Sequence, residues 1–134
     1  MTWTPAPLLW SEFKIGRKHW RVWLSCPDLS PGMFERDGEA LLGVCLYSKR
    51  EIWIDIAQPV EGLPVVWLHE VMHAALEPCH SDLYLRGLTA ESEEGYVGGM
   101  DEKLCKVLTG FGLKAPLPHG WQPLRAWAKR EERR

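Results

Sequence analysis

The stretch Val65–Leu76, which reads VVWLHEVMHAAL, says most about how this chain folds. Apolar residues recur through it at the three- and four-residue spacing of a helix. Pro64 suits the first turn of such a helix, and Pro78 ends it. Residues four apart share one face of a helix, so His69 and His73 should point the same way. We therefore predict a helix whose two imidazoles can bind one metal ion together.

The two histidines enclose Glu70 in the pattern H-E-x-x-H. Imidazole nitrogens are common zinc ligands, and a catalytic zinc takes three protein ligands and leaves a fourth position for water. Glu70 follows His69 directly, close enough to act as general base on a zinc-activated water. The pattern predicts Zn²⁺ as cofactor, His69 and His73 as two metal ligands, and Glu70 as the catalytic residue.

The third ligand is expected from a second helix, over about Ala90–Thr109, which has three glutamates in its first turns. At about 100° per residue, Glu93 falls near the centre of the buried face of this helix and Glu94 about 90° away. The two histidines lie at the edge of the buried face of their own helix, so Glu94 matches their placement and is the predicted third ligand. Glu93 is the alternative ligand. If it is not one, either it should be buried and hydrogen-bonded, or the helix should begin later than residue 90.

Three segments alternate or run apolar in the manner of strands: His19–Ser25, Ala40–Tyr47 and Ile52–Ile56. Short links between them favour an antiparallel meander. The predicted fold class is α+β, with a small antiparallel three-stranded sheet packed on the H-E-x-x-H helix and on the glutamate-bearing helix. If the third strand is the edge beside the cleft, it can pair with an extended substrate.

The chain has 134 residues, which favours one domain over residues 1–134. Residues 1–10 are expected as a loose N-terminal arm, and residues 112–134 as a Pro/Gly-rich loop followed by a basic C-terminal helix. The formal net charge is −2, so the whole chain has no bulk attraction for nucleic acid. Nucleic acid is therefore not an expected partner, and the basic tail is interpreted as a solvated helix.

Compartment signals are sparse. No apolar run approaches the ~20 residues that a membrane span needs, and no signal-peptide pattern precedes the first strand. The cysteines form no C-x-x-C pair and are interpreted as reduced thiols, at Cys26, Cys45, Cys79 and Cys105. We expect a cytoplasmic protein without a membrane segment.

The H-E-x-x-H motif, the twenty residues that separate it from Glu94, and the order of strands and helices resemble a compact zincin, a gluzincin-like metallopeptidase. The run GVCLYSKREIWIDIAQ…LHEVMHAAL…EEGYVGGM is similar to small phage- and prophage-encoded metallopeptidases and to the IrrE/ImmA-type peptidases that act on repressors. The resemblance covers about residues 40–110. It implies zinc-dependent hydrolysis of peptide bonds in a protein or peptide substrate.

One departure from that family concerns the groups around the zinc. The E-x-x-x-D pattern of larger gluzincins is missing, because Gly98 is the fourth residue after Glu94. Asp101, near the same face, is the candidate to orient a zinc-bound histidine instead. The group that stabilises the oxyanion is left open among Tyr84, Tyr96 and His80.

Two other classes of function compete with hydrolysis. A chain of this size gains stability from a bound metal, so the protein can be a non-catalytic or regulatory interaction protein stabilised by zinc. A purely structural site needs no general base, and Glu70 therefore favours the enzyme. A nucleic-acid-associated regulator that uses the basic C-terminus is the third hypothesis, and the mildly acidic whole disfavours it.

Overall fold

The computed structural model describes residues 3–80, 89, 91–95, 97 and 116–133, and they form a mixed α+β fold. Within this part of the chain, four strands make the main sheet: β1 (Leu8–Ile15), β2 (Lys18–Ser25), β5 (Gly43–Leu46) and β6 (Glu51–Asp55). They lie in the order β1-β2-β6-β5. The β2–β6 pair is parallel, and the two outer pairs are antiparallel.

The expected three-stranded antiparallel meander is therefore wrong in two respects. An additional strand, β1, pairs with β2 through a tight turn at Gly16, whose positive φ of 61° suits glycine. Residues 26–42 then carry the chain to the far side of the sheet, so that β5 forms an edge and β6 returns between β5 and β2. A crossover of that length permits parallel pairing, which a short turn does not.

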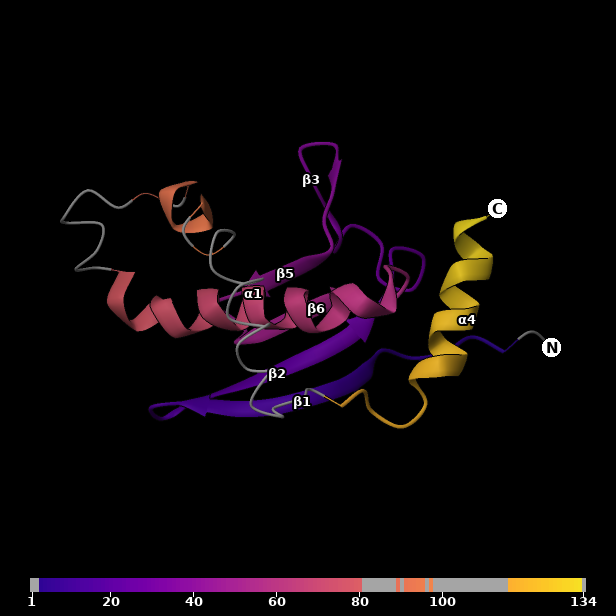
Figure 1. Cartoon of the computed structure of the whole chain (residues 1–134), viewed down its shortest axis with the longest axis horizontal. Helices are drawn as coiled ribbons and strands as arrows, with labels where there is room; N and C mark the ends of the chain where they lie inside the picture. Colours follow the sequence, from indigo (N-terminus) through magenta and orange to yellow (C-terminus); the bar gives the residue numbers. More distant parts are fainter. Residues whose placement is uncertain (1–2, 81–88, 90, 96, 98–115, 134) are drawn as a thin grey trace.

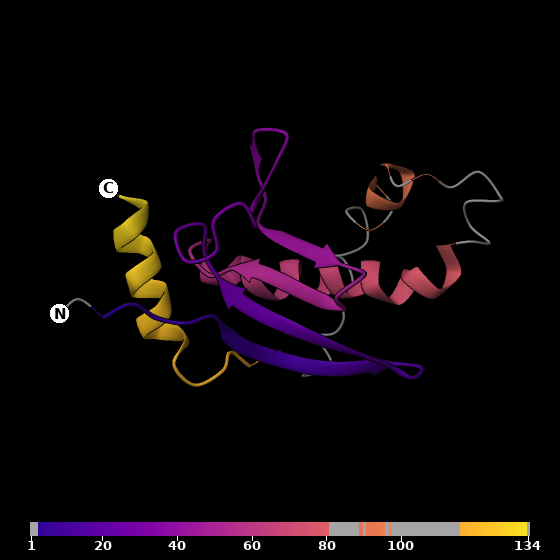
Figure 2. The ribbon, with the colours of Figure 1, turned by 180° about the vertical axis from the view of Figure 1, so that it is seen from behind.

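Helix α1 (Leu63–Leu76) lies across one face of the sheet (Figures 1 and 2). A 3₁₀ turn, η1 (Val60–Gly62), precedes it, and a second, η2 (Glu77–Cys79), follows it. Helix α4 (Trp121–Glu132) and the helical residues 91–95 lie at opposite ends of the molecule (Figure 1). Most of the expected Ala90–Thr109 helix lies outside the described residues.

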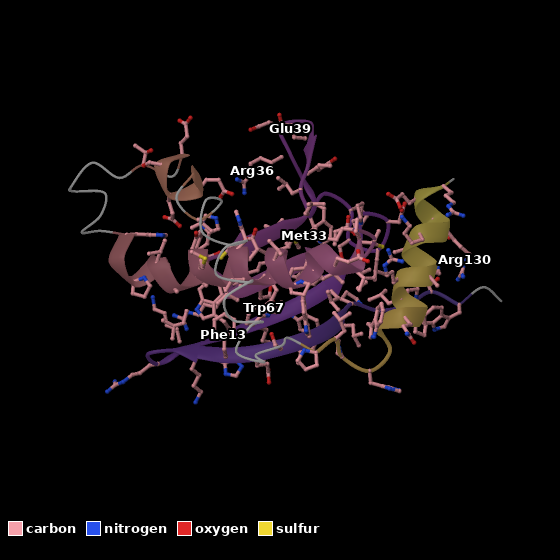
Figure 3. All side chains as sticks on the ribbon, viewed as in Figure 1. Phe13, Met33, Arg36, Glu39, Trp67 and Arg130 are labelled. Atoms are coloured by element: carbon pink, nitrogen blue, oxygen red, sulfur yellow. The ribbon has the colours of Figure 1, made fainter. Side chains whose placement is uncertain are left out.

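The core between α1 and the sheet comes from the period-two alternation of the two central strands. Val22 pairs with Ile52 and Leu24 with Ile54, and all four side chains are fully buried. Alternate residues of a strand face opposite sides of the sheet. This register therefore places the Val22–Ile52 and Leu24–Ile54 pairs on the same face of the sheet. Trp67 extends from α1 toward β1 (Figure 3), and its indole N–H donates to the Ser11 hydroxyl at 3.0 Å.

The N-terminal segment differs from expectation. The N-terminal arm does not reach residue 10, because β1 begins at Leu8 and Trp10 is buried with its indole N–H donating to the Pro116 carbonyl at 3.0 Å. The basic C-terminal helix begins at Trp121, before Pro123. Pro123 fits because the first helical turn leaves its N–H groups without intrahelical partners.

A small hairpin of β3 (Glu35–Arg36) and β4 (Glu39–Ala40) projects from the β5 side of the fold (Figures 1 and 2). Its turn residues, Asp37 and Gly38, both have positive φ, at 52° and 82°. Aspartate followed by glycine is the pairing that such two-residue turns favour. None of the helices in the described residues is long and apolar enough to cross a bilayer.

Candidate metal centre

Helix α1 presents His69 and His73 side by side, one turn apart. Their ring centroids are 5.0 Å apart, and their Nε2 atoms are separated by 3.3 Å. The geometry follows from sequence, because residues four apart on a helix project from the same face. Two imidazole nitrogens thus converge on one point.

Glu94, from the helical residues 91–95, completes a triad with the two imidazoles. Its Oε1 lies 2.7 Å from Nε2 of His69, and its Oε2 lies 2.7 Å from Nε2 of His73. One ligand atom from each of the three residues can be chosen so that all lie within 4.8 Å of one another. The structure therefore brings together the three residues that the sequence predicts as metal ligands.

The triad fits a zinc ion in the chemistry of its ligands. Two imidazoles and one carboxylate are a common ligand set for zinc sites that keep a position open. Tetrahedral bonds of about 2.0–2.1 Å place neighbouring ligand atoms about 3.3 Å apart. The two Nε2 atoms have that separation, whereas each Glu94 oxygen lies closer to its imidazole, at 2.7 Å. The Glu94 side chain is 60% exposed, so the triad is open to solvent on that side.

Glu93 occupies a different position from its neighbour, since its side chain is only 3% exposed. Its Oε1 lies 2.8 Å from Nδ1 of His73. A carboxylate only accepts hydrogen bonds, so Nδ1 of His73 donates to Glu93, and Nε2 is the ring nitrogen that faces Glu94 and would be available to a metal. The expectation that Glu93 is buried and hydrogen-bonded if it is not a ligand is confirmed. Asp101, the residue expected to orient a histidine, lies outside the described residues.

Glu70 is buried beside the triad, on the side of α1 that meets β5. Burial raises the pKa of its carboxyl, and the neighbouring imidazoles of His69 and His73 oppose that rise. Gly43 of β5 allows the close approach. A Cβ there would lie 2.7 Å from Cγ1 of Val66 and 3.3 Å from Oε1 of Glu70. Sequence reasoning missed this role of Gly43, although a glycine at the start of an apolar strand is a signal of close backbone approach.

A cavity of about 720 Å³ opens beside the triad. Its walls come from the β3–β4 hairpin, from β5, from α1 and from residues 91–95. Its lining has an excess of acidic side chains over basic ones, and its Asp, Glu and Arg residues are Arg36, Asp37, Glu39, Glu70, Glu91, Glu93 and Glu94. Arg36 extends from the hairpin toward residues 91–95, and Glu39 lies near the hairpin tip (Figure 3). The cavity is large enough for a short segment of a peptide.

Several other sequence expectations have outcomes here. The strand over Ile52–Ile56 is not an edge, because β6 lies between β2 and β5; the edge beside the cavity is β5. Cys26 and Cys45 are free thiols. Burial raises the pKa of the Cys45 thiol, so it stays protonated at neutral pH and is a poor metal ligand.

Of the three oxyanion candidates, Tyr84 and Tyr96 lie outside the described residues. The third, His80, lies with its Nε2 2.9 Å from Oε2 of Glu93. His80 thus contacts Glu93, which lies at the Nδ1 side of the His73 ring, whereas the triad lies at the Nε2 side.

Comparisons of the whole chain with family models, with curated proteins and with solved structures found no match. The case for a function therefore depends on the site itself.

Proposed function

We propose that this protein is a zinc-dependent metallopeptidase. One observation carries the proposal: Nε2 of His69, Nε2 of His73 and the Glu94 carboxylate converge near the buried carboxyl of Glu70. Of these residues, His73, Glu94 and Glu70 line a cavity of about 720 Å³. A nucleic-acid function has no comparable support, because the cavity has an excess of acidic side chains, which would repel phosphates.

The residues of the triad would hold Zn²⁺ through two imidazole nitrogens and one carboxylate. When bound, zinc supplies a Lewis acid that polarises the scissile carbonyl and lowers the pKa of water. Glu70 accepts the proton of the attacking water and passes it to the leaving amine. A buried carboxyl suits this task, because burial raises the pKa of Glu70 toward the working pH of a proton shuttle. Glu93 keeps the His73 ring in the orientation that directs Nε2 to the metal.

A protein or peptide is the proposed substrate. In the described part of the chain, β5 has β6 on one side and no strand on the other. Its outward backbone N–H and C=O groups are therefore available to an extended peptide, in the manner of strand addition to a sheet edge. Gly43, Val44 and Cys45 of this strand also line the cavity, so a peptide paired there would pass the triad.

A second candidate function is a non-catalytic protein in which zinc fixes the fold. The observation in its favour is that the triad joins two separate segments, α1 and residues 91–95. A metal bound there would hold residues 91–95 against the helix and add its binding free energy to the stability of the fold. Zinc-dependent stability and peptide hydrolysis can both be measured on the same chain, so one set of experiments tests the two candidate functions.

The decisive experiment compares the wild-type chain with Glu70→Gln, each loaded with one equivalent of zinc, on a denatured protein substrate. The amide keeps the size of the side chain but cannot take up the water proton. We expect zinc content and thermal stability to be retained while the cleavage rate, followed by mass spectrometry of the fragments, falls about 100- to 10,000-fold.

Glu61→Gln is the matched control, because Glu61 is exposed in η1 at the other end of α1. It should cleave like the wild type. Equal cleavage by the Glu70 variant would remove that residue as the base. A wild-type chain that binds zinc tightly, gains stability from it and cleaves no peptide would establish the second candidate function instead.

A further inference from the structure

The most deeply buried acid near the site is Glu93, and its surroundings extend beyond His73. Its Oε1 lies 2.8 Å from Nδ1 of His73 and 3.4 Å from the Tyr47 hydroxyl, which donates to it. Its Oε2 lies 2.9 Å from Nε2 of His80. An ionised carboxylate in the protein interior is destabilising by several kcal/mol unless such groups compensate it. Tyr47 and His80 therefore help to compensate the buried Glu93 carboxylate, a role that the metal chemistry does not assign to them.

These contacts bring three separate stretches of the chain together, since His73 and His80 belong to one continuous helical run. His73 comes from α1, His80 from the residue that follows η2, Tyr47 from the turn after β5, and Glu93 from the helical residues 91–95. Glu93 and the neighbouring Glu94 share one short stretch of helix. Whatever positions the Glu93 carboxylate therefore also positions the adjacent ligand.

Tyr47 is itself held firmly. Its ring meets His80 edge-on at a centroid distance of 5.3 Å, and it meets the buried Trp20 edge-on at 6.3 Å. Burial raises the pKa of the Tyr47 hydroxyl, so the group stays protonated and remains a donor. The ring contacts fix where that donor lies, and they also bring His80 into the same assembly.

The His80–Glu93 contact is a close approach of 2.9 Å between Nε2 and Oε2 that does not meet the geometry of a hydrogen bond. The contact is therefore electrostatic more than directional. It acts on Oε2 of Glu93, and the Tyr47 hydroxyl acts on Oε1. The two residues complement each other.

We propose that Tyr47 and His80 are positioning residues for the metal centre: they hold the Glu93 carboxylate so that it accepts the Nδ1 proton of His73 and keeps Nε2 of that ring directed at the metal. The inference rests on the metal-binding part of the proposed function and not on peptide hydrolysis. It assigns these two residues a measurable effect on zinc affinity, although neither contacts the metal.

The chain contains a comparison pair of the same chemistry. His19 and Glu12 form a contact of 3.2 Å on strands β2 and β1, but their side chains are 45% and 43% exposed. Water screens such a pair, and removing it should change little. His19→Ala is thus the matched control for His80→Ala.

The experiment measures zinc affinity by competitive chelator titration, and the Co²⁺ ligand-field spectrum, for Tyr47→Phe, His80→Ala, His80→Gln and His19→Ala. We expect affinity to fall about 10- to 100-fold in His80→Ala and about three- to tenfold in Tyr47→Phe, which loses one long hydrogen bond. His80→Gln restores a donor and should recover most of the loss. His19→Ala should match the wild type.

A double-variant cycle shows whether the effect passes through Glu93. In a Glu93→Gln background, His80→Ala should cause no further loss of zinc affinity, because the carboxylate that it positions is gone. Additive losses would overturn the proposal, and so would wild-type affinity in both Tyr47→Phe and His80→Ala. If His80→Ala fails to fold, as read by circular dichroism, Tyr47→Phe keeps the ring packing and decides the question.

Failure of the metal site itself would look different. A wild-type chain with no zinc affinity, or His73→Ala with unchanged affinity, would refute the metal centre and this proposal together. Zinc binding without peptide hydrolysis would leave the positioning role intact, because every readout above is an affinity or a spectrum.

Discussion

The two ends of helix α1 lie near different parts of the fold, α4 at one end and residues 91–95 at the other (Figure 1), and their side-chain contacts differ in kind. At the N-terminal end, Leu63 is fully buried and belongs to the same apolar cluster as Leu124 and Ala128 of α4. At the C-terminal end, the apolar Ala74 is joined by buried polar side chains: Glu70 and His73 of the helix, and Glu93 from residues 91–95.

The difference between the two ends of α1 suggests that one end contributes mainly to stability and the other mainly to metal binding. Burial of apolar surface stabilises the folded state by about 25 cal/mol per Å², and an apolar core tolerates hydrophobic substitutions that conserve volume. Buried polar groups are neutral or unfavourable unless each one finds its partner. The α4 end should therefore control the free energy of unfolding, and the triad end should control metal affinity. Substitutions at each end test that division.

The largest effect is expected for His73→Ala. This change removes one metal ligand and also the imidazole that donates to Glu93, leaving a buried carboxylate without that bond. Zinc affinity should fall by more than the about 100-fold that an outer partner contributes, and zinc should no longer raise the melting temperature. Chelator titration and calorimetry with and without zinc measure both. Retention of one tightly bound zinc would contradict the ligand assignment.

Next in size is Leu124→Ala, at the other end of the molecule. Leu124 is almost completely buried against the core, so truncation should lower the free energy of unfolding by about 2–5 kcal/mol. Zinc affinity of the folded protein should stay within about twofold, because distant sites act independently. Urea unfolding and chelator titration provide the two readouts. Gln122→Ala, exposed on the same helix, is the control. A large loss of affinity in Leu124→Ala would show that the two ends are coupled.

The smallest effect is expected at Gly43, between the two ends. A methyl group there would lie 2.7 Å from Cγ1 of Val66 and 3.1 Å from Cγ of Glu70. Gly43→Ala should destabilise the fold by about 1–3 kcal/mol and reduce hydrolysis by displacing Glu70, with zinc affinity nearly unchanged. Gly62→Ala is the control, because a Cβ there would lie at an ordinary 3.6 Å from Oε1 of Gln58, at the other end of α1, and it should leave hydrolysis at the wild-type rate. Full activity in Gly43→Ala would mean that this contact relaxes without moving the base.

Local periodicity was enough to predict α1 and the shared direction of His69 and His73, because a spacing of four residues determines the relative direction of two side chains within a helix. The period-two alternation likewise predicted the strands now seen as β2 and β6. These features depend on residues close together in the chain, so no knowledge of distant contacts was needed.

The tertiary structure alone decided the features that depend on distant contacts. The order β1-β2-β6-β5 follows from the route of residues 26–42, which no local pattern encodes. Glu93 and Glu94 differ by about 100° around a helix, so the packing of that helix on α1 determines which carboxylate meets Nε2 of His73 and which meets Nδ1. The same holds for His80, whose approach to Glu93 joins segments that only the fold brings together.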